Sequence, residues 1–277
     1  MATRILHLSD LHIGTREDAA VARALSTLVE RTRPELLAVT GDLTHRNRSA
    51  QHDAAARFLR GLGGSLLVVP GNHDIPLWPP ARFLRTFAAF ERTWGDTQPV
   101  YASETLHLVG LNSVRPWRHQ SGGLRRSQLA WAAKRLAEAA PGALRVVALH
   151  HHMIGAPWRT RKKPVAERNR VLAELVDSGA ELVLAGHTHQ AAVAERREFE
   201  VVHGDVGAVV VSVAPGLGQP RPQRRGEARG LQLYEAADET IAVSTYIWRD
   251  DDWALTAKRL FPRGVKPLKE GGEPPAR

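Results

Sequence analysis

The feature that most constrains the fold is a regular alternation of short apolar runs with longer amphipathic segments. The apolar runs are rich in β-branched residues and predict buried strands over residues 4–8, 35–40, 65–69, 105–111, 144–149 and 181–185. Between most of them, apolar residues recur with helical spacing over residues 17–32, 50–61, 81–93, 125–139 and 165–177. Strands that alternate with helices in this way predict a layered α/β fold.

The pattern changes after His189, where predicted strands follow one another without long helices. These strands cover residues 192–203, 207–213, 229–235 and 240–248, and together they look like a largely antiparallel sheet. Two sheets packed face to face, with helices outside, would bury both sets of apolar runs. We therefore expect a four-layer α-β-β-α sandwich of two mixed sheets. It would form one catalytic domain over residues 1–262, followed by a flexible Gly- and Pro-rich tail over residues 263–277.

The composition narrows the available chemistry. The chain has no cysteine, which excludes disulfides, thiolate zinc sites and cysteine nucleophiles, and leaves His, Asp, Glu and Asn as ligands. No secretion signal precedes residue 5, and no apolar run approaches the roughly 18 residues that cross a bilayer, so we expect a cytoplasmic protein without membrane insertion. The formal net charge of +9 favours an anionic partner, although an Arg-rich bias of the whole proteome would account for it equally well.

Five polar clusters follow the ends of predicted strands. They are Asp10-Leu11-His12, Gly41-Asp42, Gly71-Asn72-His73-Asp74, His150, and Gly186-His187-Thr188-His189. Taken alone, each cluster reads equally as a turn or as a buried histidine. In layered α/β folds, however, the loops beyond the carboxyl ends of the strands converge on one edge. We therefore expect these side chains to form a single site.

The residue types in these clusters suit a pair of divalent metal ions. Imidazoles beside carboxylates and an amide form a borderline N/O site, which favours manganese or iron, with zinc or cobalt as alternatives. Two ions about 3.5 to 4 Å apart require a bridging carboxylate, for which Asp42 is the candidate. A bridging water would be acidified toward a pKa of about 7 and would supply hydroxide. Asn72 would offer a neutral oxygen ligand, which keeps the site electropositive.

The order D-x-H, G-D, G-N-H-D, H, G-H-x-H over residues 4–215 resembles the calcineurin-like metallophosphoesterase superfamily. Its spacing resembles the branch of class III cyclic-nucleotide phosphodiesterases and glycerophosphodiesterases. The resemblance implies that Asp42 belongs to both metal sites, and that the other ligands are Asp10, His12 and His189 for one ion and Asn72, His150 and His187 for the other. It also implies that His73 stabilises the transition state or protonates the leaving oxygen, while Asp74 orients His73 or closes the turn.

Two further segments bear on this resemblance. Residues 122–131 read G-G-L-R-R-S-Q-L-A-W and resemble a helix start of the same branch, although a plain amphipathic helix explains them too. After His150 the sequence departs from the family, because relatives commonly have His-His-Pro-Pro where this chain has His150-His151-His152-Met153. His151 or His152 is therefore an alternative ligand in place of His150.

Basic loops follow several of the strands that lead to the predicted site. They cover residues 115–119, 158–163 and 221–225 with Arg229, and they provide Arg118, His119, Trp158 and Arg159 as candidate substrate contacts. On the metal edge these loops would attract an anionic substrate, and an exposed Trp would stack on a base. Solvated loops without a binding role are the alternative.

The predicted reaction is hydrolysis of a small phosphodiester, such as a cyclic nucleotide or a glycerophosphodiester, by a hydroxide that bridges the metals. A nuclease acting on DNA or RNA is an alternative that the basic loops favour and the lack of a DNA-facing domain disfavours. A phosphomonoesterase or pyrophosphatase would use the same metal core. A non-catalytic scaffold ranks last because every expected ligand is present. A homodimer is the commonest assembly for such chains.

Overall fold

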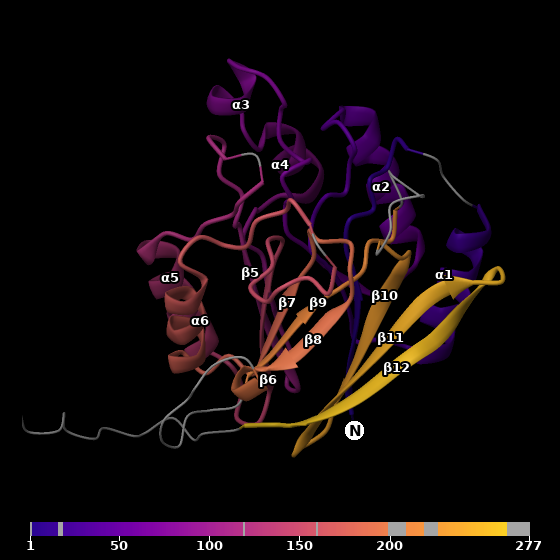
Figure 1. Ribbon diagram of the computed structural model, residues 1–277, viewed down its shortest axis with the longest axis vertical. Helices are drawn as coiled ribbons and strands as arrows, with labels where there is room; N and C mark the ends of the chain where they lie inside the picture. The colour runs from indigo at the N-terminus through magenta and orange to yellow at the C-terminus, as the bar shows by residue number, and fades with distance from the viewer. Residues whose placement is uncertain are drawn as a thin grey trace, which may run out of the picture.

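Two six-stranded sheets face each other at the centre of the molecule (Figure 1). The computed structural model describes residues 2–15, 19–118, 120–158, 160–198, 209–218 and 227–264. The first sheet runs, from edge to edge, through β12 (Asp252–Pro262), β11 (Thr240–Arg249), β10 (Gly230–Ala236), β1 (Thr3–Leu8), β2 (Leu36–Val39) and β3 (Ser65–Val68). The second runs through β4 (Val100–Ala102), β5 (Leu106–Leu111), β6 (Leu144–Leu149), β7 (Leu182–Ala185), β9 (Val210–Val213) and β8 (Ala192–Glu195).

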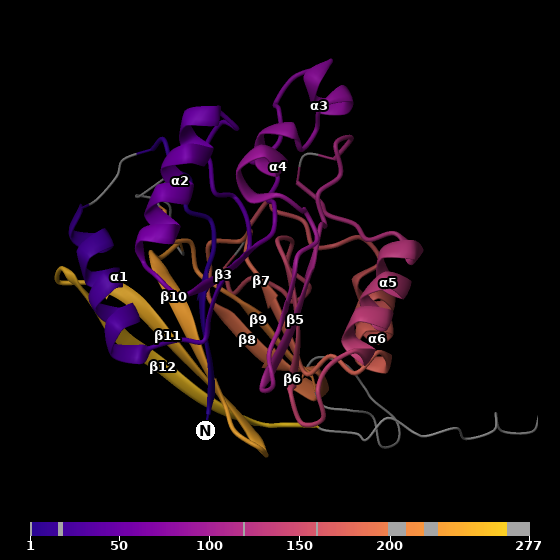
Figure 2. The same ribbon diagram turned by 180° about the vertical axis from the view of Figure 1, so that it is seen from behind.

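Helices cover the outer face of each sheet, as Figure 2 shows. The helices on the first sheet are α1 (Ala19–Thr32) and α2 (Ser49–Gly61), and those on the second are α5 (Arg126–Ala137) and α6 (Arg168–Asp177). Of the helices that the structure describes, none is long and apolar enough to span a bilayer.

Three apolar cores separate the four layers. The central core joins Ile5 of the first sheet to Val146 of the second. An outer core joins Leu25 of α1 to β1, and the opposite one joins Leu136 of α5 to β6. Burial on both faces explains why the inner strands β2, β5, β7 and β9 are nearly continuous apolar runs. The expected four-layer α-β-β-α sandwich is confirmed.

The predicted helix over residues 81–93 is wrong as a single element. The chain forms two short helices there, α3 (Ala81–Leu84) and α4 (Ala88–Trp94). Arg85 breaks the helix because its φ of −138° and ψ of 45° lie outside the helical region. The Thr86 hydroxyl donates a 2.7 Å hydrogen bond to the Arg82 carbonyl at the break.

The strands after His189 do not form a sheet of their own, which corrects the second part of the prediction. β9 pairs parallel with β7, whereas β10 pairs antiparallel with β1 and extends the first sheet. This arrangement covers an edge of β1 that would otherwise expose unpaired backbone groups. The strand predicted over residues 192–203 ends at Glu195, where the chain turns into the 3₁₀ helix η1 (Arg196–Glu198).

Some predictions fall partly or wholly on residues that lie outside the described part of the chain. These are residues 17 and 18 of the first predicted helix, 199–203 and 207–208 of two predicted strands, 119 and 159 of two basic loops, the basic stretch 221–225, and all but residues 263 and 264 of the predicted tail. The domain boundary at residue 262 stays a prediction. Two described strands, β4 and β12, were not predicted.

Candidate metal centre

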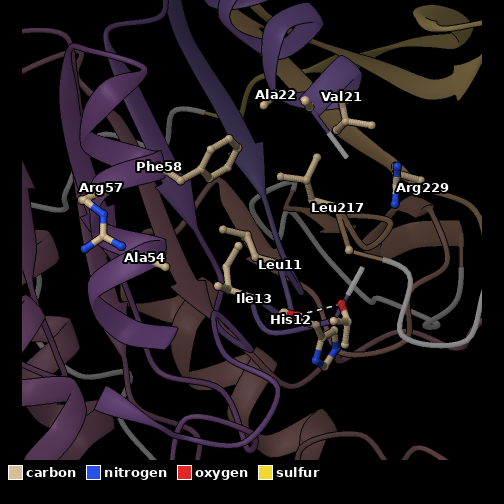
Figure 3. A pocket seen from close by; sticks show the side chains of 13 residues that line it. Leu11, His12, Ile13, Val21, Ala22, Ala54, Arg57, Phe58, Leu217 and Arg229 are labelled. Atoms are coloured by element: carbon tan, nitrogen blue, oxygen red, sulfur yellow. Dashed lines mark hydrogen bonds between the residues drawn. The ribbon is translucent and has the colours of Figure 1, made fainter. Parts of the chain in front are cut away.

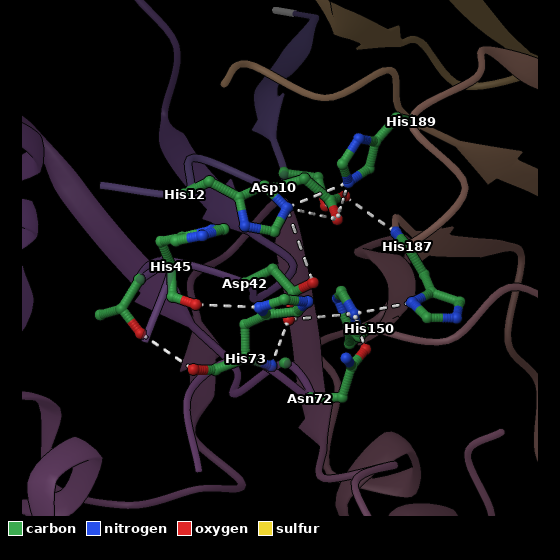
Figure 4. Close-up of polar contacts among 12 residues, drawn as sticks. Asp10, His12, Asp42, His45, Asn72, His73, His150, His187 and His189 are labelled. Atoms are coloured by element: carbon green, nitrogen blue, oxygen red, sulfur yellow. Dashed lines mark hydrogen bonds and ion pairs between the residues drawn. The ribbon is translucent and has the colours of Figure 1, made fainter. Parts of the chain in front are cut away.

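The loops that follow β1, β2, β3, β6 and β7 meet at one end of the two sheets and bring the predicted polar clusters together (Figure 4). The Asp10 amide donates to the Gly41 carbonyl and the His12 amide to the Asp42 carbonyl, each at 2.9 Å. Asp10, His12, Asp42, His187 and His189 all have left-handed backbone, with φ between 48° and 71°. Such backbone costs energy for non-glycine residues and is common at functional sites.

Two glycines of the motifs are required by close packing between the loops. A Cβ atom at Gly71 would lie 2.1 Å from the Asp42 amide nitrogen. A Cβ atom at Gly186 would lie 1.8 Å from the Ser9 hydroxyl. Larger residues would push the loops apart and separate the ligating side chains.

One group of side chains gathers around Asp10. The Asp10 Oδ1 atom lies 3.0 Å from His189 Nε2, which in turn lies 3.1 Å from His12 Nε2. His12 Nε2 also lies 3.8 Å from Asp42 Oδ2. All four side chains are buried, so these polar atoms have little access to water.

A second group gathers around His150. Its Nε2 atom lies 3.1 Å from Asn72 Oδ1, 3.2 Å from His187 Nδ1 and 3.4 Å from Asp42 Oδ1. Asp42 therefore presents one carboxylate oxygen to each group. The structure brings all seven candidate side chains together in two groups that share Asp42, and their role as metal ligands stays a prediction.

The protonation of the imidazoles shows what this arrangement can hold. A carbonyl oxygen only accepts hydrogen bonds, so His150 Nδ1 must donate to Thr40 at 2.7 Å and His187 Nε2 to Gln120 at 3.0 Å. In the metal-free chain the raised pKa of His150 places a second proton on its Nε2 atom, 3.2 Å from the lone pair of His187 Nδ1. A metal cation would take the place of that proton, because both nitrogens can then offer lone pairs to it.

Two buried carboxylate oxygens point to the same conclusion. Within the described part of the chain, neither Asp10 Oδ1 nor Asp42 Oδ2 accepts a hydrogen bond, although His189 Nε2 lies 3.0 Å from Asp10 Oδ1. Buried oxygens of this kind normally have a partner, and an ion supplies one. His189 Nδ1 lies 3.3 Å from Glu227, a carboxylate–histidine pair of the kind that orients metal ligands. The donor set of nitrogen and oxygen atoms fits divalent metal ions.

The electrostatics of the centre are dominated by Asp42 and its neighbours. Burial acts to raise the pKa of Asp42, but nearby His150 and His73 outweigh it and hold that pKa well below its ordinary value. Burial acts to lower the pKa of His150, but the Asp42 carboxylate outweighs it and raises that pKa to about 9. Buried negative charge here is therefore stabilised by positive charge, which a metal ion would also provide.

The positions of His150, His151 and His152 differ in how close each lies to the other candidate ligands. His150 is the one that approaches both Asp42 and Asn72. His151 Nδ1 lies 2.8 Å from the Ser113 hydroxyl, and the His152 ring stacks on His187 with the ring centres 5.7 Å apart. These positions favour His150 over the two alternatives.

His73 and Asp74 occupy different surroundings. His73 Nδ1 donates to the His45 carbonyl at 3.0 Å, which leaves Nε2 as the free nitrogen of a ring that lines the cleft over the centre. Asp74 is buried and accepts hydrogen bonds from the amides of Leu43, Thr44 and Gly71 at 2.9 to 3.1 Å. These contacts favour the turn-closing role of Asp74 over an orienting role toward His73.

The cleft over the metal centre has a volume of about 620 Å³. Beyond the predicted residues, its lining contains His45, Gln120, Arg161 and Lys162. His45 stands three residues after Asp42 and Lys162 lies in a basic loop, so both had a weak signal in the sequence, whereas Gln120 had none.

The predicted substrate contacts lie elsewhere or are not described. Arg118 and Trp158 are exposed and are absent from the described lining of the cleft. The Trp158 amide donates to the Gln190 side chain at 2.8 Å. His119 and Arg159 lie outside the described residues.

A second cavity of about 440 Å³ lies on the other side of His12, between α1 and α2 (Figure 3). Its lining is largely apolar, with Leu11, Ile13, Phe58 and Leu217 directed into it. Among the described residues it shares only His12 with the cleft over the metal centre. The polar cleft is therefore the candidate site for a charged ester.

Comparisons with known proteins agree with this geometry. Residues 3–191 match the family model described as calcineurin-like phosphoesterase. The cAMP/cGMP dual specificity phosphodiesterase of Mycobacterium tuberculosis is 31% identical over 87% of this chain and 78% of its own. The glycerophosphodiester phosphodiesterase GpdQ of Enterobacter lignolyticus is 27% identical over 71% of this chain and 74% of its own.

Solved structures share the fold. The purple acid phosphatase PPD1 of yellow lupin superposes with a TM-score of 0.70 over 95% of this chain and 54% of its own. Its sequence identity to this chain is 11%, so the likeness concerns architecture alone.

Proposed function

This chain belongs to the calcineurin-like phosphoesterase family and is a metal-dependent phosphoric ester hydrolase, and we propose that it hydrolyses small phosphodiesters at the Asp42 centre. The relatives named above act on cyclic nucleotides and on glycerophosphodiesters, and both classes are diesters of modest size. The cleft volume of about 620 Å³ matches a pocket for a small molecule. A cyclic nucleotide or a glycerophosphodiester is thus the favoured substrate class.

The observation that carries the proposal is the position of Asp42 between two groups of nitrogen and oxygen atoms. Its Oδ2 atom faces the group of Asp10, His12 and His189, and its Oδ1 atom faces the group of Asn72, His150 and His187. One carboxylate shared in this way is what a pair of ions requires. When bound, two divalent ions activate water for attack on phosphorus and neutralise charge on the ester.

Other residues of the cleft would act on the substrate directly. His73 Nε2 is free because Nδ1 is bonded to the His45 carbonyl, so that nitrogen can hold a proton for the leaving oxygen. Arg161 and Lys162 line the same cleft and would bind the anionic ester. They replace Arg118 and Trp158 as proposed substrate contacts, whereas His119 and Arg159 lie outside the described residues and stay predictions.

The finer assignments belong to the same proposal. We propose manganese or iron as the ions, on the basis of the mixed imidazole and carboxylate ligands. The cytoplasm as location and a homodimer as assembly stay predictions from the sequence and from base rates.

A substrate panel tests the proposal. Bis-p-nitrophenyl phosphate, p-nitrophenyl phosphate, cyclic AMP, glycerophosphocholine and single-stranded DNA would each be assayed with manganese, iron and zinc. We expect the diesters of small size to be turned over fastest. Preferential cleavage of DNA, with binding that weakens steeply as salt rises, would instead support the nuclease alternative.

Asp42→Asn tests the role of the shared carboxylate directly. Loss of this carboxylate removes several kcal/mol of transition-state stabilisation, which corresponds to about a thousandfold or more in rate. Asp53→Asn on the exposed face of α2 is the matched control and should leave the rate unchanged. An Asp42→Asn enzyme that hydrolyses diesters at the wild-type rate would refute the proposed centre.

A further inference from the structure

Five large apolar side chains are exposed together around α3. Leu77, Trp78, Phe83, Leu84 and Trp117 are between 46% and 78% exposed, and we call this group the α3 tip. Single exposed apolar residues are ordinary, but a group of this size marks a surface that binds something.

A buried arginine holds the two segments of the α3 tip together. Arg82 is 4% exposed, and its guanidinium donates to the carbonyls of Pro76 at 2.8 Å, Pro116 at 2.5 Å and Arg118 at 3.2 Å. Pro116 and Arg118 flank Trp117, so Arg82 fixes Trp117 beside the segment that carries the other four side chains. The α3 tip is therefore a defined surface.

The charge around the α3 tip is mainly positive, and the exposed Glu167 is close enough to Arg118 to interact with it electrostatically. Residues 75–90 and 105–137 contain no Asp or Glu, and Arg85 and Arg118 are exposed there. Arg46 is also exposed and lines a side cavity of about 230 Å³ together with Leu77 of the tip. A partner must therefore combine an apolar region with negative charge.

The shape of the lobe favours a flat partner. Figures 1 and 2 both place α3 at the outer end of its lobe, beyond α4 and far from the two sheets. Trp78 and Leu84, at 74% and 78% exposure, are the most exposed of the large apolar residues. Protruding aromatic and aliphatic side chains ringed by Arg are typical of a contact with the interface of a bilayer.

A second copy of this chain fits the α3 tip less well. In a two-fold dimer each patch meets itself, so the arginines of one copy would face those of the other, with Glu167 as the acidic group near Arg118. An anionic bilayer carries opposite charge, which adds about 1 kcal/mol of attraction per basic residue near its surface. We propose that the α3 tip docks on an anionic lipid bilayer, with Trp78 and Leu84 entering the interface and Arg85 and Arg118 near the lipid phosphates.

The α3 tip lies close to the cleft over the metal centre, so docking of the tip would also position the cleft. The side cavity that Leu77 lines also contains His45, Asn72, His73 and Gln120, which line the cleft over the metals. Docking places the mouth of the cleft beside the lipid surface. The proposal does not depend on the identity of the substrate.

Vesicle binding tests the proposal with the full-length chain. Sedimentation with phosphatidylcholine vesicles, with and without phosphatidylglycerol, should show binding to the anionic vesicles that weakens as salt rises. Changing Trp78→Ser together with Leu84→Ser should lower the partition coefficient by about tenfold or more. Leu255→Ser with Leu260→Ser is the matched control, because both side chains are exposed on β12, and it should bind as the wild type does.

Two variants that each remove one positive charge complete the test. Arg85→Gln should weaken binding, whereas Arg23→Gln on the exposed side of α1 should not. Thermal unfolding and hydrolysis of bis-p-nitrophenyl phosphate in solution confirm that the tip variants are folded. Equal binding to neutral and anionic vesicles, or undiminished binding by the Trp78 and Leu84 variant, would overturn the proposal. A concentration-dependent dimer that this variant abolishes would overturn it in favour of a second copy.

Discussion

The Nδ1 atom of His189 lies 3.3 Å from the carboxylate of Glu227, a residue that no sequence motif singled out. Glu227 is 38 positions further along the chain, and its side chain is 5% exposed. The contact directs the Nε2 atom of His189 toward Asp10, where it lies 3.0 Å from Oδ1. Glu227 thus fixes the orientation of a proposed ligand without being one.

Glu227→Gln should weaken metal binding. An amide in place of the carboxylate orients His189 less firmly and makes its Nε2 atom less basic, which typically lowers metal affinity by about 10- to 100-fold. The affinity is measured by titrating manganese into metal-free protein in a calorimeter. Glu239→Gln, at an exposed position, serves as the control. Unchanged affinity in the Glu227 variant would show that the contact has no role at the metal.

Removal of metal should reduce both activity and stability. We expect dialysis against a chelator to abolish hydrolysis, and manganese to restore it. Because the ion binds the assembled centre of the folded chain, it should also stabilise the fold, by about 2.7 kcal/mol at a concentration of 100 times Kd. The midpoint of thermal unfolding, recorded with and without manganese, measures the second effect. A chelated enzyme with full activity would contradict the metal assignment.

His73→Asn should lower kcat in a way that depends on the leaving group. A proton donor contributes about 10²- to 10⁴-fold when the leaving oxygen is basic, as in a cyclic nucleotide. p-Nitrophenolate leaves with little help from a proton donor, so kcat for bis-p-nitrophenyl phosphate should fall much less. The measurement is the ratio of kcat losses for cyclic AMP and bis-p-nitrophenyl phosphate. Equal losses for both substrates would point to phosphate binding by His73 in place of proton transfer.

His52 should make the stability of the fold sensitive to acid. Burial, aided by Arg92, lowers the pKa of His52 from 6.5 to about 4, and Nε2 lies 2.9 Å from Asn47 Oδ1. As the pH falls, His52 therefore becomes protonated in the unfolded chain at a higher pH than in the folded chain. Stability from this residue is complete above pH 6.5 and falls as the pH drops toward 4, by at most about 1.4 kcal/mol per pH unit.

His52→Gln removes that proton uptake and tests the sign of the effect. Urea unfolding of both proteins at several pH values between 4 and 7.5 gives the difference in unfolding free energy. We expect the wild type to lose stability relative to the variant as the pH falls through this window. A difference that is constant with pH would show that His52 titrates alike in the folded and unfolded chain.

The sequence allowed the four-layer fold to be predicted because each layer leaves a local signature. β2 and β7 are continuous apolar runs since both of their faces are buried, and α1 and α5 show the apolar spacing of helices with one buried face. The division of the last strands between two sheets left no such signature. β9 and β10 have similar apolar patterns, and only pairing with β7 or β1 assigns each to its sheet.

The sequence by itself determined which residues would gather at the centre, because loops at strand ends converge wherever parallel strands lie side by side. It thereby indicated Asp10, Asp42 and His150 as neighbours. Only the tertiary structure decided their partners, such as Thr40 for His150 and Glu227 for His189. Those contacts join residues 110 and 38 positions apart, and they depend on how loops pack across the layers. The spacing of apolar residues along the chain indicates which face of a helix or strand is buried, but it does not indicate how distant loops pack against each other.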